Sequence, residues 1–465
     1  MNAQVKMATL GTGRLATYRN IAGMLLALRR LRGQEQWSRQ QVDAYQTQAL
    51  QRLRSYAYAH SPFYQRFHRG LAHHPLQDLP VLTKTLLHDF FDEIVTDRAV
   101  RRELVTEHIR SGRGPQPLLG RYVVTATSGT TGNSSPILYN SHEWATVLAS
   151  FTRYERHIGS LAGMIQRPKL AVVASTTAWH ISALIGSTVR SSWLPMLRVD
   201  VGEPLESIVE QLNRWQPAVL ATYASMAGIL AEEQRAGRLR IAPARIVSSA
   251  EVLTPQLRQR IETVWGTGTV FNQYGASEGG TFAVECTSHC GLHLFEDLVI
   301  FEVVDRQNRP VPSGVYGEKV LLTVLFNYTL PLIRYELSDS VRLATTPCPC
   351  GCAFALIENI QGRLEEVLRF PGQDSGTVAT HPMVFYRILD ATPVQGWQVV
   401  QEGEQLRLCL SGTPGVIDEP ALIAMVRSAL ERQGALPPPI TIEWQDEIVR
   451  GATGKASRIV ATRQL

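Results

Sequence analysis

The sequence predicts an α/β protein with a large, layered N-terminal domain rich in parallel strands and a small, mobile α+β C-terminal domain. Apolar β-type runs alternate with helical stretches from about residue 126 to about residue 343. Alternation over such a length favours α/β layers with parallel strands. The character of the sequence changes after Gly362, and the remainder has strands and a helix of its own. We therefore expect domains over residues 1–362 and 363–465.

The composition indicates a large folded core and no concentrated basic surface. The chain has 465 residues, of which 44% are hydrophobic and 19% charged, which argues against disorder. The net charge of +5 is dispersed, and the densest basic run, at residues 28–32, is interpreted as the solvated face of a helix. We therefore expect no nucleic-acid partner.

The N-terminus shows no targeting signal. The apolar run at residues 21–28 is too short to span a bilayer. Six cysteines in a chain of this length do not suggest a disulfide framework. The prediction is a cytoplasmic protein with no membrane partner.

The individual elements follow from apolar spacing and turn residues. Helical spacing covers residues 36–67, and Thr83 is expected to cap a short helix after a turn. Strands are predicted at residues 169–175, 218–222, 245–248, 269–272, 299–305, 319–326, 398–401, 406–410 and 441–444. Further helices are predicted at residues 204–215, 254–265 and 419–433.

A loop rich in glycine and hydroxyl residues follows a β-branched run at residues 122–125. Glycine allows close backbone approach, and successive N–H groups form a nest for an anion. Because no lysine follows the second glycine, the loop is not a Walker A motif. We predict a polyphosphate site at Ser128, Gly129, Thr130, Thr131 and Gly132.

Three later segments carry chemistry suited to a nucleotide. Tyr274 can stack on a base, and Glu278 can coordinate Mg²⁺ bound to phosphates. Asp339, at a strand end, can accept the ribose hydroxyls, and Arg363 can donate twice to phosphate. Lys455 follows Gly451 and Gly454 in a glycine-containing loop near the C-terminus, where a flexible ammonium can follow developing charge.

Five of the six cysteines fall into two short clusters, around residues 286–293 and 348–352. Tetrahedral Zn²⁺ takes four Cys or His ligands, commonly as two close pairs. We predict a structural zinc site at Cys286, His293, Cys348 and Cys350, with Cys290 and Cys352 as reserve ligands. Reduced cysteines without a metal are the alternative.

Taken together and in order, these motifs resemble the adenylate-forming superfamily of acyl-CoA synthetases and adenylation domains, and most closely its phenylacetate–CoA ligase-like branch. The likeness runs from about residue 50 to about residue 460. It is carried by Ser128-Gly129-Thr130-Thr131-Gly132, Ser249-Ala250-Glu251, Gln273-Tyr274-Gly275-Ala276-Ser277-Glu278, Arg334-Tyr335 with Asp339, Gly362-Arg363 with Glu365, and Gly454-Lys455.

The resemblance implies a two-step reaction that uses ATP and Mg²⁺. A carboxylate attacks the α-phosphate to give an acyl-adenylate and pyrophosphate, and a nucleophile, usually CoA, then displaces AMP. It implies that the residues 249–251 contact adenine, that Lys455 bridges carboxylate and α-phosphate, and that the C-terminal domain rotates at Glu365. His180 lies where the family places a residue beside the acid.

The sequence departs from the family pattern at several points. Glu336-Leu337-Ser338 precedes Asp339 where a Thr-Gly pair is usual, and residues 378–382 lack the familiar form near the CoA tunnel. An amine, a carrier-protein thiol or another small nucleophile therefore stays open as acceptor, as does a catalytically silent, zinc-stabilised binding protein. The partners expected are a small carboxylic acid and its acceptor, with the chain a monomer or homodimer.

Overall fold

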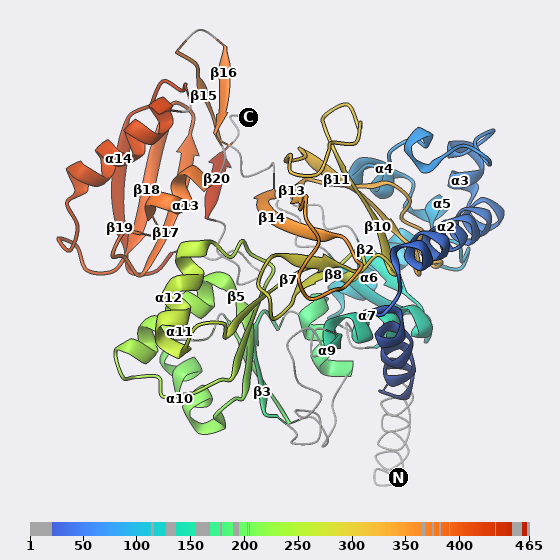
Figure 1. Cartoon of the computed structure of the whole chain (residues 1–465), viewed down its shortest axis with the longest axis horizontal. Coiled ribbons are helices and arrows are strands. Elements are labelled where there is room, and N and C mark those ends of the chain that lie inside the picture. Colours follow the sequence, from blue (N-terminus) through green and yellow to red (C-terminus); the bar gives the residue numbers. More distant parts are fainter. Residues whose placement is uncertain are drawn as a thin grey trace.

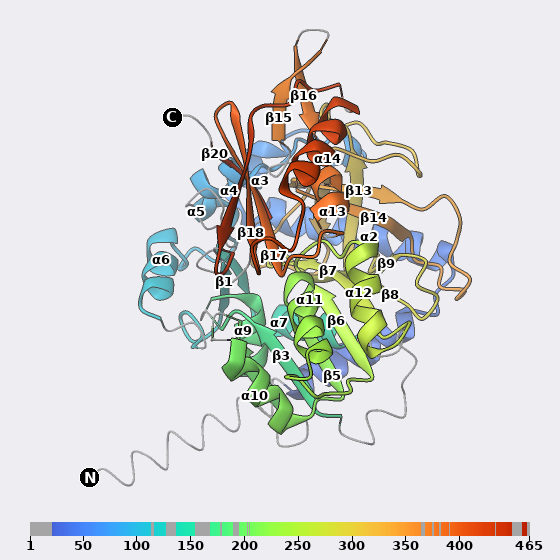
Figure 2. The same ribbon diagram turned by 90° about the vertical axis from the view of Figure 1, so that its left-hand side faces the viewer.

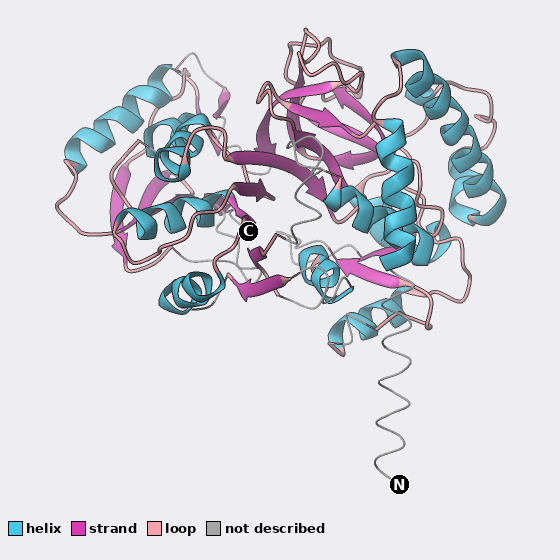
Figure 3. Ribbon diagram, turned by 60° about the horizontal axis from the view of Figure 1, so that its bottom comes forward, coloured by secondary structure: helices cyan, strands magenta, loops and turns pink. Residues whose placement is uncertain are grey.

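The structure, a computed structural model, describes residues 21–112, 116–126, 136–153, 168–176, 179–188, 195–201, 203, 205–363, 368–373, 376–380, 383–389, 391–432, 434–448 and 458–462. Residues 21–34 are helical. The other helices lie mainly around the sheets, on the outside of the molecule (Figure 3). They are α2 (Arg39–His60), α3 (Pro62–Phe67), η1 (Leu76–Asp78), α4 (Lys84–Asp89), α5 (Phe91–Ile94), α6 (Arg102–Arg110), α7 (Ser141–Thr152), α9 (Ile181–Thr188), α10 (Leu205–Trp215), α11 (Ala224–Arg235), α12 (Pro255–Trp265), α13 (Met383–Leu389) and α14 (Glu419–Arg432).

The strands that the structure describes belong to five sheets. They are β1 (Val123–Ala126), β2 (Pro136–Tyr139), β3 (Leu170–Ala174), β4 (Met196–Asp200), β5 (Val219–Tyr223), β6 (Arg245–Ser249), β7 (Val270–Ala276), β8 (Gly280–Glu285), β9 (Leu292–Leu294), β10 (Val299–Val304), β11 (Lys319–Val324), β12 (Tyr335–Leu337), β13 (Asp339–Leu343), β14 (Leu356–Arg363), β15 (Leu368–Pro371), β16 (Thr377–Thr380), β17 (Gly396–Glu402), β18 (Gln405–Ser411), β19 (Ile440–Gln445) and β20 (Ile459–Thr462).

The largest sheet has nine strands in the order β13-β14-β9-β8-β7-β6-β5-β3-β4. Its half from β4 to β7 is parallel, whereas the pairs from β7 to β13 are antiparallel. The apolar residues of α10, α11 and α12 pack on the parallel half and share a core with it. The predicted α/β class is therefore confirmed, although the sheet is mixed rather than wholly parallel.

A second, larger core joins the N-terminal helices to β1, β2, the antiparallel half of the large sheet and the three-stranded sheet β10-β11-β12. The helical segment predicted over residues 36–67 is interrupted, because Ser61 has extended backbone angles between α2 and α3. Proline disfavours helical geometry in the preceding residue and is well placed at the first position of a new helix. Pro62 therefore ends α2 and begins α3. Thr83 caps α4 as expected.

The C-terminal part has a four-stranded sheet in the order β19-β18-β17-β20. Its core consists of residues between Leu368 and Ile459 only, from β15, the four strands, α13 and α14. Figures 1 and 2 show this part beside the parallel half of the large sheet, with the β15–β16 hairpin projecting from it. None of the helices that the structure describes has the length and apolar character needed to cross a bilayer.

Candidate functional site

Several of the predicted site segments meet at the carboxyl edge of the parallel half-sheet. β5 ends at Tyr223 and β6 at Ser249, and these two residues are paired in register. Ser249 also pairs with Gln273 of β7. Because ligands of open α/β sheets bind outside the carboxyl ends of the strands, we expect a ligand site at this edge.

Tyr274 and Asp339 come together there although 65 positions separate them. The Tyr274 hydroxyl donates to a carboxylate oxygen of Asp339 at 2.6 Å. The Tyr274 ring is held edge-on by Phe282 and Phe301, at centroid distances of 5.6 and 6.1 Å. An aromatic face and a carboxylate are thus fixed side by side, as a base and its ribose require.

Gly275 lies near the end of β7, and Glu278 lies in the turn that leads from β7 into β8. A Cβ at Gly275 would lie 2.4 Å from the carbonyl oxygen of Gly280, so only glycine fits. Glu278 is 6% exposed. Burial, and after it the Glu278 carboxylate, raises the pKa of Tyr139, whose hydroxyl donates to the Ser277 carbonyl at 2.6 Å.

The predicted phosphate loop, residues 128–132, lies outside the described residues, but the strands that flank it are described. β1 and β2 form an antiparallel pair in which Ala126 faces Pro136. The Ala126 N–H donates to the Trp179 carbonyl at 3.0 Å. Together with the bond from Tyr139 to Ser277, this holds the base of the loop between His180 and the turn that carries Glu278.

His180 is oriented by a residue that the sequence analysis did not identify. The Ser175 hydroxyl lies 2.8 Å from Nδ1 of His180, and the Ser175 N–H donates to the Tyr223 hydroxyl at 3.1 Å. Burial raises the pKa of Tyr223, and the bond from Ser175 opposes this shift. Ser175 directly follows β3, so its place at the carboxyl edge was the available signal.

The segment Ser249-Ala250-Glu251 has an unusual backbone and an engaged carboxylate. Ala250 has a φ of 66°, in the left-handed region that side chains other than glycine rarely adopt. Glu251 accepts from the N–H of Ser225 at 2.8 Å, at the N-terminus of α11, where the helix dipole favours an anion. The Glu251 carboxylate therefore stabilises the N-terminus of α11.

Of the two phosphate-directed residues predicted at and after the end of β14, the structure describes the backbone of Arg363. Lys455 lies outside the described residues. The backbone of Arg363 ends β14 and pairs with Asp339 of β13, which brings two predicted motifs into register. The Arg363 side chain lies outside the described part of the chain.

The four predicted metal ligands form one cluster. The ligand atoms of Cys286, His293, Cys348 and Cys350 all lie within 4.8 Å of one another. The sulfurs of Cys286 and Cys348 are 3.5 Å apart, and Cys350 Sγ lies 3.2 Å from His293 Nε2. Tetrahedral zinc with bonds of about 2.3 Å holds two sulfurs about 3.8 Å apart, so the donor set fits this ion. Cys290 is not part of this group among the described residues.

The surroundings of the cluster suit metal binding. Burial lowers the pKa of His293 and so favours the neutral imidazole that a metal needs, while a hydrogen bond to the backbone of Phe354 opposes the shift. Burial also raises the pKa of Cys350 to about 12, which opposes thiolate formation as long as no cation is bound. Thiols packed this closely gain from a cation that stabilises their thiolates.

Comparison with known proteins agrees with the family likeness. No protein-family model matches the chain. It is 28% identical to the phenylacetate-coenzyme A ligase of Thermus thermophilus over 384 residues, which is 79% of each chain. It is also 28% identical to the Escherichia coli phenylacetate-coenzyme A ligase, over 71% of this chain and 73% of that protein. A solved 2-hydroxyisobutyryl-CoA ligase in the postadenylation state shares the fold, with a TM-score of 0.69 and 20% identity over 90% of this chain and 89% of that one.

Proposed function

We propose that this chain, a member of the phenylacetate–CoA ligase-like branch of the adenylate-forming superfamily, is an ATP-dependent acid–CoA ligase. In the first step a carboxylate oxygen bonds to the α-phosphorus of ATP, and the bond from that phosphorus to the pyrophosphate oxygen breaks. In the second step the CoA sulfur, having lost its proton, bonds to the acyl carbon and AMP leaves. The products are a thioester, AMP and pyrophosphate.

The contact between Tyr274 and Asp339 is the observation that carries the proposal. The Tyr274 hydroxyl donates to the Asp339 carboxylate at 2.6 Å, so a carboxylate is fixed beside an aromatic residue that lies just before the turn with the buried Glu278. In our proposal Tyr274 packs on adenine and Asp339 accepts the ribose hydroxyls. The backbone of Ser249, Ala250 and Gln273 borders the adenine.

The remaining roles follow the order of the motifs along the chain. Residues 128–132 would hold the leaving phosphates, and Arg363 would donate to the phosphate next to the ribose. Lys455 would neutralise charge where the carboxylate meets the α-phosphate, since phosphoryl transfer depends on positioning and electrostatics. The C-terminal domain, residues 363–465, would turn at Glu365 relative to residues 1–362 and so carry Lys455 away for the second step.

Two metal ions belong to this proposal. Glu278 would hold Mg²⁺, which neutralises phosphate charge when bound. Cys286, His293, Cys348 and Cys350 would hold a structural Zn²⁺, because four protein ligands leave no open position for substrate. A cytoplasmic location fits an enzyme that draws on ATP and CoA.

Exchange of labelled pyrophosphate into ATP tests the first step. With arylacetic, benzoic and short aliphatic acids as a panel, we expect exchange that depends on at least one acid. Lys455→Ala should reduce it by about 100-fold or more, the usual scale for losing a group that stabilises transition-state charge. Lys169→Ala is the matched control, since Lys169 bonds the Trp215 carbonyl at the opposite end of β3. Absence of exchange with every acid would overturn the proposal.

Addition of an acceptor tests the second step. With the acid that supports exchange, CoA should yield the acyl-CoA thioester and AMP in equal amounts by mass spectrometry. If an adenylate forms but only an amine or a carrier-protein thiol consumes it, the proposed acid activation is supported and CoA is not the acceptor.

A further inference from the structure

The hairpin of β13 and β14 connects the metal cluster to the nucleotide site. At its open end Asp339 pairs with Arg363. At its closed end Leu343 pairs with Ile357, and the loop between them carries Cys348 and Cys350. β13 is about 13 Å long at the usual rise per strand residue. Figure 1 shows the hairpin between the C-terminal sheet and β11.

The cluster ties this closed end to the body of the large sheet. Cys286 directly follows β8 and His293 lies on β9, while β14 pairs with β9 through Leu356 and His293. The Leu294 N–H donates to the Ala355 carbonyl at 2.8 Å. A Cβ at Gly291 would lie 2.4 Å from the Ile357 carbonyl oxygen, so the backbones are in close contact here.

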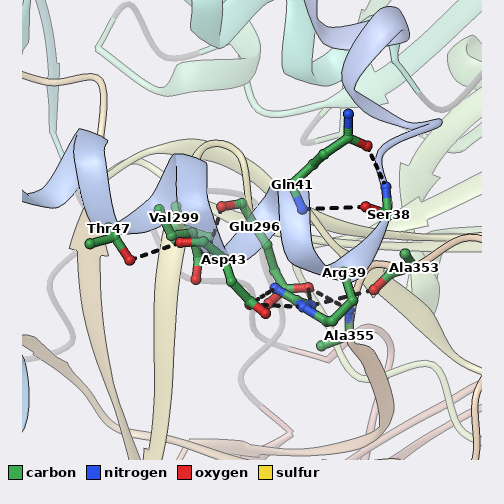
Figure 4. Close-up of polar contacts among 10 residues, drawn as sticks. Ser38, Arg39, Gln41, Asp43, Thr47, Glu296, Val299, Ala353 and Ala355 are labelled. Carbon is green, nitrogen blue, oxygen red and sulfur yellow. Dashed lines mark hydrogen bonds and ion pairs between the residues drawn. The ribbon is translucent and has the colours of Figure 1, made fainter.

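A separate set of polar contacts holds the other side of the loop (Figure 4). Arg39, in the first turn of α2, pairs with Glu296 at 2.6 Å. The same Glu296 oxygen accepts from the Ala355 N–H at 2.6 Å, and Arg39 donates to the Ala353 carbonyl at 3.4 Å. The residues after the two cysteines are therefore fixed by α2, whereas Cys348 and Cys350 themselves are fixed through the cluster.

The strand pairing does not by itself set the position of Asp339. The register of β13 and β14 shifts between Asp339 and Val341 and again between Arg342 and Leu343. Such irregularities leave residues unpaired and bend the strand. A change of register by one residue would turn the side chains of β13 to the opposite face. Contacts outside the pair therefore help to hold the hairpin: the Gly314 N–H donates to the Leu343 carbonyl at 2.8 Å and the Gly317 N–H to the Val341 carbonyl at 2.9 Å, while the cluster holds the loop at the closed end.

We propose that the metal cluster is a register clamp: by fixing the closed end of the β13–β14 hairpin, it holds Asp339 against Tyr274 and opposite Arg363. The clamp gives the bound ion a positioning role for nucleotide binding, beyond local folding of the cysteine loop. The role assigned to Asp339 rests on the proposed function, whereas the effect on the hairpin does not.

The test compares full-length Cys350→Ser with wild type and with Cys290→Ser. Cys290 is an exposed thiol four positions from Cys286 and outside the cluster, which makes it a matched control. Three quantities are measured: bound zinc by elemental analysis, ATP affinity by calorimetry, and amide hydrogen exchange at residues 339–343 and, as an internal reference, at 398–410 of β17 and β18. Chelation and re-addition of zinc to the wild type gives the same comparison without a mutation.

We expect wild type and Cys290→Ser to bind one zinc per chain. Cys350→Ser and the chelated protein should lose the zinc, exchange at least tenfold faster at residues 339–343 and not at 398–410, and bind ATP at least tenfold more weakly. Re-added zinc should restore the chelated protein but not Cys350→Ser.

Three results would overturn the clamp. The first is a wild type that binds no zinc when zinc is supplied. The second is loss of zinc with unchanged hydrogen exchange at residues 339–343. The third is a loss of exchange protection at residues 398–410 as large as that at 339–343, which would indicate general unfolding. If the wild type binds zinc but no ATP, the proposed function is wrong. The hydrogen-exchange comparison then still tests whether the cluster fixes the hairpin.

Discussion

Ser175 illustrates how a single residue can organise the site. Its hydroxyl contacts Nδ1 of His180 and its N–H donates to the Tyr223 hydroxyl. A hydrogen bond at one ring nitrogen fixes the orientation of an imidazole and the nitrogen that it presents elsewhere. We interpret Ser175 as a positioning residue for His180, the side chain predicted to lie beside the acid.

Ser175→Ala should lower kcat/KM for the acid by about tenfold, the scale of one lost hydrogen bond of ~1.4 kcal/mol. The KM for ATP should stay unchanged, and Ser175→Thr should recover part of the activity. Steady-state kinetics with each substrate varied in turn measures this. Equal losses for both substrates would indicate general damage instead of a positioning role.

His68 should make stability depend on pH. Burial, and after it the charge of Arg54, lowers its pKa from 6.5 to about 4. Between these values the unfolded chain binds a proton that the folded chain does not, so stability rises with pH. The contribution is fully present above about pH 6.5, disappears as the pH falls towards 4, and is at most about 3 kcal/mol.

Urea unfolding of the wild type and His68→Phe at pH 7 and pH 5 checks this prediction. The wild type should lose about 2 kcal/mol more than the variant over that interval. His74→Phe, at a side chain that is 50% exposed, should behave as the wild type. A wild-type loss equal to that of His68→Phe would contradict the assignment.

At this scale the sequence identified residue types better than contacts. Tyr274 and Asp339 were each predicted to bind a nucleotide, and the structure adds the bond between them. Glu251 was predicted within an adenine segment, yet its carboxylate bonds Ser225. A local motif carries no information about which distant backbone amide a carboxylate will meet. The roles of all these residues stay predictions.

The elements were predicted best where their spacing was regular. β3, β5 and β6 and helices α10, α12 and α14 lie within a few residues of their predicted bounds. No strand was predicted at β13, β14, β15 or β16, because bulged strands and strands of only four residues produce a weak sequence pattern. The break at Ser61 was missed because the apolar spacing continues across it.

Arg153 shows how elements are joined. It is fully buried after α7, bonds Glu35 and Asp297 at 2.8 Å each, and donates to the carbonyl of Leu31. Its guanidinium also lies 5.2 Å from the ring centre of Phe354 in the cysteine loop. One side chain thus links the first helix, α7, the segment after β9 and the loop of the metal cluster.

Arg153→Met should destabilise the protein by about 3–5 kcal/mol, because removing one partner leaves two buried carboxylates without a counter-charge. Urea unfolding at pH 7 measures the change. Arg214→Met is the control: its bond to Glu210 joins side chains that are 74% and 72% exposed, and such pairs contribute about 0–1 kcal/mol. Similar losses for the two variants would contradict the argument.

At the scale of the whole molecule, the described residues form separate hydrophobic cores rather than one. The core of the N-terminal helices and antiparallel strands, and that of α10 to α12 on the parallel strands, include no residue beyond Ile357. The core of the C-terminal part begins at Leu368. The residues between them, 364–367, lie outside the described part of the chain. A domain can rotate as a rigid unit only if its hydrophobic core consists of its own residues. The separate cores on either side of this short segment therefore support the proposed boundary after residue 362.

A fragment of residues 364–465 should therefore fold on its own. Its core includes Leu368 and Phe370 of β15, Phe385 of α13 and Trp397 of β17, all buried within the fragment's own residues. Domains of about 100 residues are stable by about 5–15 kcal/mol, so we expect cooperative urea unfolding and a dispersed amide spectrum. A shorter fragment that begins at residue 396 lacks β15 and α13 and should be markedly less stable. If the longer fragment is unfolded, its core depends on residues 1–362, and free rotation of the C-terminal domain as a rigid unit would be wrong.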